Sequence, residues 1–261
     1  MTKVRIGMKS YVINLKTSID RRQYMEKLLK PYNDFLDVNF IEAVDGRILS
    51  DKELNEIWNQ DGTYNEYGRY MKGGEIGVAL SQRKCYEEII KNRDDMALIF
   101  EDDVVFKDGV DLRKVLDTLK IILQTNEPTI ILLSGSYWFT KTLKITDTNY
   151  KLASVFEAMG AMSYLVNQSA ARIMLNMKKV YLADDWYSWK RKGVNVYALH
   201  PHIAGDMDLF SSVIVSGYEG LRRKNLPLLN KLRAYYRGVI RYFLGMIGKW
   251  EPRSVEYIRI I

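Results

Sequence analysis

The sequence predicts an α/β domain whose mainly parallel sheet is flanked by helices. Short apolar runs with the Ile, Val and Leu content of buried strands occur over residues 8–15, 37–43, 98–106 and 129–133. They are separated by segments of helical spacing over residues 18–29, 78–92 and 112–123. Strands that alternate with helices are typical of βαβ units, in which neighbouring strands run parallel.

The rest of the chain fits the same class. Residues 50–71 are polar and predict a short helix with a loop, and Gly73-Gly74 predicts a break before the next helix. The pattern further predicts a β-rich excursion over 137–155, strands over 161–166 and 194–199, and a helix over 168–177. A boundary near Gly217 divides the chain into a domain of residues 1–217 and a basic, amphipathic helical segment of residues 218–261.

Composition and charge exclude several classes of protein. Cys85 is the only cysteine, so we expect no intramolecular disulfide and no cysteine-based zinc site, which is compatible with a reducing cytosol. Residues 1–7 lack the apolar run of a signal peptide, and no stretch of ~20 apolar residues predicts a transmembrane helix. The formal charge of +7 is concentrated after Tyr218, which predicts an anionic partner, either a membrane surface or a nucleic acid.

Three consecutive carboxylates, Glu101, Asp102 and Asp103, interrupt an apolar run. A folded core does not readily accept them, because a buried carboxylate without a partner carries a large desolvation cost. We therefore expect the acids at the carboxyl end of a strand, where open α/β sheets bind their ligands. The alternative is an acidic turn that is solvated and has no function.

Four segments, taken in order, resemble glycosyltransferase family 25, the lipopolysaccharide-type galactosyl- and glucosyltransferases related to the collagen galactosyltransferases. They are Asn14-Leu15 followed by Arg21-Arg22, then Ala43-Val44-Asp45-Gly46, then residues 75–81, and finally residues 98–104. Weaker similarity continues at residues 160–166, at Ala183-Asp184-Asp185-Trp186 and at His200-Pro201-His202. The family usually has Ser-His where this chain has Ser81-Gln82, so no role of that histidine is carried over.

The resemblance implies a GT-A-type, Rossmann-like fold and transfer of a hexose from a sugar nucleotide. Departure of the diphosphate builds negative charge on its β-phosphate, and a divalent cation held by carboxylates neutralises that charge. Glu101 and Asp103 have the spacing of the acid-x-acid motif of GT-A enzymes, and residues two apart on a strand face the same side. We expect Mn²⁺ or Mg²⁺ with Asp103 as a direct ligand and Glu101 or Asp102 acting through water or on the ribose. His202, rather than His200, would complete the metal's shell, and a surface role is the alternative for both histidines.

The remaining motif residues are expected to bind the nucleotide. They are Asn14, Leu15, Arg21, Arg22, Asp45, Gly46, Glu75 and Ser81. Arg21 and Arg22 would fork onto a phosphate or pair with a carboxylate, whereas a solvated first helical turn explains them equally well. Asp45 and Gly46 would lie beside the uracil and ribose or form a plain turn. Glu75 opens a helix, where the helix dipole alone favours a carboxylate.

Inverting transfer needs a base that takes the proton of the acceptor hydroxyl. Asp184 and Asp185 are the candidates, and Asp184 is preferred because it matches the family's aspartate better. Adjacent carboxylates disfavour double ionisation, which raises one pKa and improves a base. Alternatively, both acids cap a helix that begins at Trp186. Trp186 and Trp189 would form an apolar platform for the acceptor sugar, or belong to the core.

The basic C-terminal segment carries aliphatic and aromatic residues between its lysines and arginines, a pattern typical of an interfacial helix on an anionic bilayer. The alternative is a helix that packs on the catalytic domain with its basic side chains outward.

The resemblance to family 25 implies an inverting enzyme that transfers galactose from UDP-galactose to a sugar of a lipid-linked bacterial lipooligosaccharide or lipopolysaccharide, and the ordered strand-end motifs are the observation behind it. It would act in the cytoplasm, at the inner face of the cytoplasmic membrane. The alternatives are a UDP-glucose-dependent transferase, an idle homologue that only binds the sugar nucleotide, and a nucleic-acid-binding protein that uses the basic segment.

Overall fold

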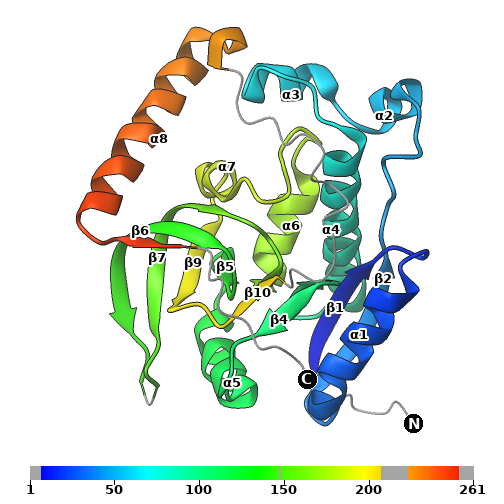
Figure 1. The fold of residues 1–261 in the computed structure, drawn as a ribbon, viewed down its shortest axis with the longest axis vertical. Helices are drawn as coiled ribbons and strands as arrows, with labels where there is room; N and C mark the ends of the chain where they lie inside the picture. Colours follow the sequence, from blue (N-terminus) through cyan, green and yellow to red (C-terminus); the bar gives the residue numbers. More distant parts are fainter. Residues whose placement is uncertain (1–6, 147, 207–222, 253–261) are drawn as a thin grey trace.

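The computed structural model describes residues 7–146, 148–206 and 223–252, and Figure 1 shows their fold. Within these residues a nine-stranded sheet has the order β11-β6-β7-β9-β5-β8-β3-β1-β2. Its strands are β1 (Met8–Asn14), β2 (Leu36–Glu42), β3 (Met96–Glu101), β5 (Thr129–Leu132), β6 (Ser136–Lys144), β7 (Lys151–Met159), β8 (Ser163–Asn167), β9 (Asn195–His200) and β11 (Trp250–Glu251). A separate two-stranded sheet joins β4 (Val104–Phe106) to β10 (Ala204–Asp206).

The directions of the strands confirm the predicted fold class. The pairings place β1, β2, β3, β5, β6 and β9 in one direction, and β7, β8 and β11 in the other. By strand direction the sheet is therefore mainly parallel, with six of the nine strands aligned. Its parallel pairs are β1 with β2, β1 with β3 and β5 with β9, and the other five pairs are antiparallel. Ile13 of β1 lies opposite Glu101 of β3, so these two neighbouring strands end at the same edge of the sheet.

Helices cover both faces of the sheet (Figure 1). They are α1 (Ile19–Leu29), α2 (Asp51–Ile57), α3 (Gln60–Tyr67), α4 (Gly73–Asn92), α5 (Leu112–Leu123), α6 (Gln168–Asn176), α7 (Trp186–Arg191) and α8 (Leu228–Met246), with short 3₁₀ turns at Lys30–Tyr32 and Arg223–Asn225. α4, α6 and α7 share a hydrophobic cluster with Ile99 and Tyr164 of the sheet. α1 and α5 share the opposite cluster with Val12 and Leu98, so alternate residues of each strand face different helices.

Three predicted elements differ from the structure. Residues 50–71 contain two short helices, α2 and α3, where one was predicted. α4 begins at Gly73, so the glycine pair opens this helix instead of preceding it. The predicted strand over 98–106 is two strands, because β3 stops at Glu101 and the chain turns through Asp102 and Asp103 before β4. β4 then pairs with β10 in the separate small sheet.

The C-terminal segment packs on the domain through α8 and β11. β11 pairs with β6 and places Trp250 opposite Trp138, so it extends the main sheet. Of the predicted segment of residues 218–261, residues 218–222 and 253–261 lie outside the described ranges. In the part of the chain that is described, no helix combines the length and apolar character needed to cross a bilayer.

Candidate active site

Two neighbouring strands and the first helix bring four of the predicted residues together. Asn14, the last residue of β1, donates a hydrogen bond from Nδ2 to Asp102 Oδ2 at 2.7 Å. Arg21, in the first turn of α1, donates to Asp102 Oδ1 at 2.8 Å and to Asp103 Oδ2 at 3.1 Å. Asp102 is 8% exposed, so these bonds replace the water that its carboxylate has lost. The acidic cluster predicted at a strand end is therefore formed, and Arg21 is paired with carboxylates.

The carboxylates of Asp102 and Asp103 stabilise the positive charge of Arg21. Burial lowers the pKa of the Arg21 guanidinium, but the hydrogen bond and the charge of Asp102 outweigh burial and raise that pKa. Leu15, also predicted to contact the nucleotide, lies in the turn between β1 and α1. Its carbonyl oxygen accepts a hydrogen bond from the Ser18 N–H at 2.9 Å, so its backbone shapes this turn.

Arg22 lies apart from the cluster. Its Nε donates to Glu26 Oε1 at 3.0 Å, and its guanidinium carbon is 4.2 Å from the centre of the Phe40 ring. The side chain is half exposed. This position matches the solvated first helical turn, so the structure does not bring Arg22 together with Asp102 and Asp103.

Glu101 faces the α4 side of the sheet. It is two residues beyond Ile99 on β3, and Ile99 belongs to the α4 cluster. Tyr164 belongs to the same cluster as Ile99. Burial raises the pKa of Tyr164 and the Glu101 carboxylate raises it further, which agrees with a position of Glu101 on this side of the sheet. Because β3 ends at Glu101, the alternation of side chains along a strand does not extend to Asp103. The strand geometry that was expected to place Glu101 and Asp103 on one side therefore does not apply to Asp103, which lies in the turn after β3.

The predicted metal ligands do not assemble into a three-residue site. The described ranges contain no group of three His, Cys, Asp or Glu side chains that could hold a metal ion. His202 is 2% exposed and lies beside Glu251, with 3.5 Å between Nδ1 and Oε1. Burial, followed by the charges of Lys107 and His200, lowers the pKa of His202 to about 4 and outweighs the nearby carboxylate. Mg²⁺ commonly binds through one or two carboxylates together with substrate phosphates and water, so the carboxylates of Glu101 and Asp103 are ligands of a kind that this ion uses.

Close backbone contact explains Gly46 and Ser81. A Cβ atom on Gly46 would lie 1.9 Å from the Gly73 carbonyl oxygen, so the loop after β2 touches the start of α4. Ser81 Oγ accepts from the Val44 N–H at 2.8 Å and donates to the Gly77 oxygen at 2.6 Å. Both residues thus hold this loop against α4. Any effect of Gly46 or Ser81 on nucleotide binding would come from the position that they give to the loop.

Asp45 lies in the same loop and pairs with Arg47. Arg47 Nε donates to Asp45 Oδ1 at 2.7 Å, and Nη2 donates to Oδ2 at 2.5 Å. These hydrogen bonds lower the pKa of the Asp45 carboxyl. Asp45 is therefore ionised and held in a local turn, as the plain-turn alternative expected.

Glu75 is half of a buried ion pair at the start of α4. Arg69 donates to its two carboxylate oxygens at 2.8 and 2.6 Å, and the Lys72 N–H donates at 2.9 Å. The Arg69 and Glu75 side chains are 6% and 7% exposed. Glu75 is thus engaged by the protein itself. The sequence analysis missed Arg69, because the five residues between Arg69 and Glu75 include a loop with no regular period.

The adjacent acids Asp184 and Asp185 have different surroundings. Asp185 accepts from the Tyr67 hydroxyl at 2.8 Å and from the Ser188 N–H at 3.3 Å, and so caps α7. Asp184 is partly exposed and accepts from the Gly160 N–H at 2.9 Å. Burial raises the pKa of Asp184, and the negative charges of Asp185 and Glu75 add to that increase. The capping role therefore falls to Asp185, and Asp184 keeps the properties expected of a base.

A short backbone segment connects Asp184 to the acidic strand end. Gly160 donates to Asp184, and Met162, two residues later, accepts from the Glu101 N–H at 2.8 Å. The candidate base and the end of β3 therefore lie on the same side of the domain.

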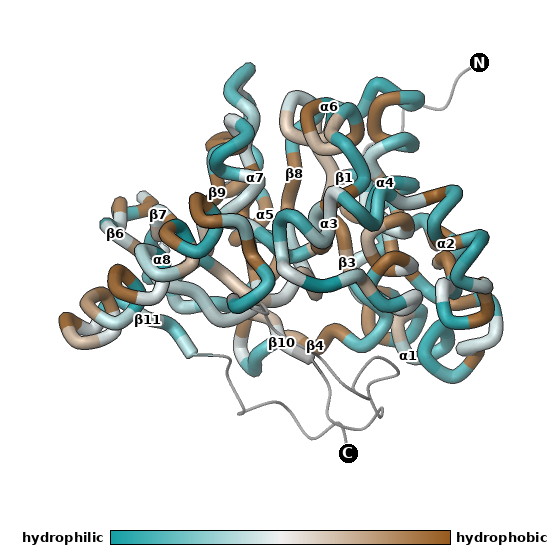
Figure 2. Tube along the Cα trace, turned by 90° about the horizontal axis from the view of Figure 1, so that it is seen from above, coloured by the Kyte–Doolittle hydropathy of each residue, from teal (hydrophilic) through white to brown (hydrophobic). Residues whose placement is uncertain are grey.

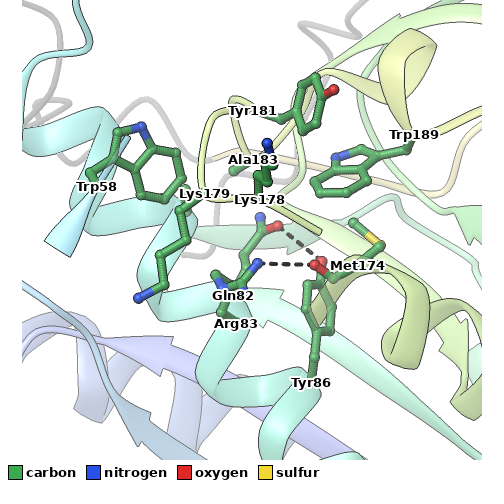
Figure 3. A pocket seen from close by; sticks show the side chains of 11 residues that line it. Trp58, Gln82, Arg83, Tyr86, Met174, Lys178, Lys179, Tyr181, Ala183 and Trp189 are labelled. Carbon is green, nitrogen blue, oxygen red and sulfur yellow. Dashed lines mark hydrogen bonds between the residues drawn. The ribbon is translucent and has the colours of Figure 1, made fainter. Parts of the chain in front are cut away.

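A small cavity adjoins this region (Figure 3). It is lined by side chains that include Gln82, Tyr86, Ala183 and Trp189, and its volume of about 20 Å³ has room for a single water molecule. A hexose does not fit, so this cavity is not the sugar site. Gln82 accepts a hydrogen bond from the Tyr86 hydroxyl at 3.2 Å. Trp186 and Trp189 are 0% and 5% exposed, so they belong to the core and form no acceptor platform.

Glu157 and Arg237 were also missed by the sequence analysis. Glu157, on β7, is 4% exposed and accepts from Arg237 at 3.1 and 2.8 Å and from Arg241 at 3.2 Å. An Arg237 nitrogen also lies 3.7 Å from Asp185 Oδ1. No local pattern pairs a strand glutamate with a helix 80 residues later, so the signal was absent from the sequence.

Comparison with known proteins identifies the family. The family model "Glycosyltransferase family 25 (LPS biosynthesis protein)" matches residues 8–187. The chain belongs to glycosyltransferase family 25. The resemblance inferred from the sequence motifs is therefore confirmed, and family 25 membership favours a hexosyltransferase over a nucleic-acid-binding protein.

Individual relatives match stretches of different length. Procollagen galactosyltransferase 2 of Mus musculus is 37% identical over 101 residues, which are 37% of this chain and 16% of the mouse protein. Putative glycosyltransferase R655 of Acanthamoeba polyphaga mimivirus is 27% identical over 210 residues, which are 76% of this chain and 62% of the viral protein. A UTP-bound UGPase from Acinetobacter baumannii has a TM-score of 0.41 at 11% identity, covering 93% of this chain and 97% of the UGPase. That structural likeness is too slight to bear on function.

Proposed function

We propose that this protein is an inverting hexosyltransferase that transfers galactose from UDP-galactose to a sugar of bacterial lipooligosaccharide or lipopolysaccharide. Membership of family 25, a family described by lipopolysaccharide biosynthesis, supports the reaction class, and the mouse relative is by name a galactosyltransferase. The observation that carries the proposal is the connection, through Gly160 and Met162, between the high-pKa carboxyl of Asp184 and the acidic end of β3.

Asp184 is the proposed general base. It would take the proton of the acceptor hydroxyl while the bond between sugar and diphosphate breaks on the opposite face of the sugar. A carboxylate whose pKa is raised by burial and by neighbouring charge binds that proton more readily. Asp185, held by Tyr67 and by the start of α7, would fix the loop that carries Asp184.

Arg21 and the acids of the strand end would receive the diphosphate. Arg21 lies between Asp102 and Asp103, and its guanidinium would supply positive charge to the diphosphate. Glu101 and Asp103 would hold Mn²⁺ or Mg²⁺, which supplies positive charge to the β-phosphate as the sugar departs. Asn14 would keep Asp102 in place, since Asn14 donates to its carboxylate.

The first test is release of UDP from UDP-galactose and from UDP-glucose by the wild type, Asp184→Asn and Asp185→Asn. We expect turnover with UDP-galactose and a loss of about 10²–10⁴-fold in Asp184→Asn, whose fold is checked by circular dichroism. The acid limb of the wild-type pH profile should lie above the ordinary pKa of an aspartate. Unchanged turnover in Asp184→Asn would remove Asp184 from this role, and turnover with UDP-glucose alone would change the donor.

The second test measures turnover with EDTA and after addition of Mn²⁺ or Mg²⁺. We expect EDTA to abolish turnover and the cation to restore it. Turnover that does not depend on metal would remove Glu101 and Asp103 from their proposed roles and leave Arg21 as the cation that meets the diphosphate. A wild type that binds but does not turn over any sugar nucleotide would be the idle homologue.

A further inference from the structure

The polarity of α8 is the reverse of that expected for a surface helix. Its arginines at positions 233, 237 and 241 recur every fourth residue and turn toward the domain. Arg237 and Arg241 donate to Glu157, and Arg233 donates to Glu66 at 3.3 Å. The alternative considered for this segment, a helix with its basic side chains outward, is therefore wrong for these three arginines.

Most of the large apolar side chains of α8 face water instead, whereas Leu244 is buried. Leu229 is 74% exposed and Tyr235 is 69% exposed. The other members of this outward face are Leu228, Leu232, Tyr236, Tyr242, Phe243 and Met246, each more than half exposed. Figure 2 shows hydrophobic segments along α8 at the outer edge of the molecule. Monomeric soluble proteins rarely expose a continuous apolar patch of this kind, and such a patch marks an interaction surface.

An open groove continues the outward face at the end of α8. Gly238 and Gly245 lie seven residues apart on the helix and leave space beside Trp138 and Trp250, whose rings stack with centres 6.0 Å apart. The groove has a volume of about 690 Å³ and is also lined by Tyr242 and Met246. Trp and Tyr are the residues that gather where a membrane meets water.

The charge of α8 indicates which kind of partner its outward face binds. Residues 228–246 contain no aspartate or glutamate, and Lys231 on the helix and Lys224 before it are exposed. We propose that the outward face of α8 and the adjoining groove lie in the interface of an anionic lipid bilayer. This inference deepens the proposed function, on which it rests for its purpose, because a lipid-linked acceptor would then lie in the same membrane as the enzyme.

The test is co-sedimentation of the full chain with vesicles. We expect binding to vesicles of phosphatidylcholine with phosphatidylglycerol, weaker binding to phosphatidylcholine alone, and release by salt. Tryptophan fluorescence should shift to the blue on binding, because Trp250 is 46% exposed in the free protein. Absence of binding to both kinds of vesicle would overturn the proposal.

Matched variants locate the surface. Leu229→Ser should weaken binding to the anionic vesicles about tenfold, because a leucine that enters the interface leaves water. Ile121→Ser on α5 is the control, since Ile121 is 71% exposed and Leu229 is 74% exposed. Equal binding by the two variants would contradict the assignment. So would concentration-dependent association of the free wild type that Leu229→Ser abolishes, because α8 would then bind a second copy of the chain.

A separate readout keeps this proposal distinct from the proposed function. Release of UDP from UDP-galactose without vesicles should be the same in Leu229→Ser and the wild type, because Leu229 is 74% exposed to water. Vesicle binding without turnover would support the membrane-binding proposal and refute the proposed transferase function. Turnover without vesicle binding would support the transferase function and refute the membrane-binding proposal.

Discussion

The buried ion pair between Arg69 and Glu75 allows the sharpest test of the energetics at the start of α4. Glu75→Gln removes one charge and keeps the size of the side chain. The side chains of Arg69 and Glu75 are 6% and 7% exposed, so little water can reach Arg69 to solvate its charge in the variant. Removing one partner of such a pair costs about 3–5 kcal/mol, because the other charge stays buried. At roughly 2–4 °C for each kcal/mol in a domain of this size, the melting temperature should fall by about 6–20 °C.

Urea unfolding followed by circular dichroism measures the free energy directly. Arg47→Ala is the control, because Arg47 and Asp45 form a pair whose side chains are 41% and 20% exposed and which should be worth at most about 1 kcal/mol. The double variant Arg69→Met/Glu75→Gln should lose less free energy of unfolding than the sum of the losses of Arg69→Met and Glu75→Gln, because it leaves no buried charge without a partner. A loss for Glu75→Gln no larger than that of Arg47→Ala would refute the reasoning.

The same variant also tests the environment of Asp184. The charge of Glu75 contributes to the raised pKa of Asp184, after burial and the charge of Asp185. Glu75→Gln should therefore lower that pKa and move the acid limb of the pH profile to lower pH, because the base keeps its ionised form further into the acid range. An acid limb that moves to higher pH would contradict this assignment.

Three further predictions concern stability. Gly46→Ala should cost about 1–3 kcal/mol or more by urea unfolding, because its Cβ would meet the Gly73 oxygen at 1.9 Å, whereas Gly245→Ala, with its nearest contact at 3.9 Å, should not destabilise. Between pH ~4 and ~6.5 the unfolded state binds a proton on His202 and the folded state does not, so stability should rise with pH in the wild type and less steeply in His202→Gln. Arg237→Met should cost about 3 kcal/mol, because the side chain of Glu157 is 5% exposed. Arg233→Met should cost at most about 1 kcal/mol, because the side chain of Glu66 is 20% exposed, and equal losses would contradict the difference in burial.

Local patterns predicted most of the elements of the fold. The helix over 112–123 matches α5, and the strands over 8–15 and 37–43 match β1 and β2 within a residue or two, because period and flanking residues act over short distances. The division of the predicted strand 98–106 depends on β10, about a hundred residues later. No window on the sequence around Glu101 contains that information.

The candidate site divides in the same way. Asn14, Arg21 and Asp102 were all predicted at the nucleotide site from the resemblance to the family, and the structure joins them by hydrogen bonds. Arg69 and Glu157 were not expected, because their partners lie across a loop and across the fold. A sequence identifies which charged residues are unusual, but the tertiary contacts decide whether they meet a substrate or each other.

Several of these contacts converge on the loop that carries Asp184 and Asp185. Gly160 ties Asp184 to the segment before β8, Tyr67 ties Asp185 to α3, and Arg237 brings α8 to within 3.7 Å of Asp185. The inward side of α8 is therefore part of the support of the candidate base, whereas its outward side contacts none of these groups. Substitutions on the two sides should separate accordingly: an inward change such as Arg237→Met should alter turnover without vesicles, and an outward change such as Leu229→Ser should alter vesicle binding alone. If Leu229→Ser also lowered turnover in solution, α8 would not divide into these two sides.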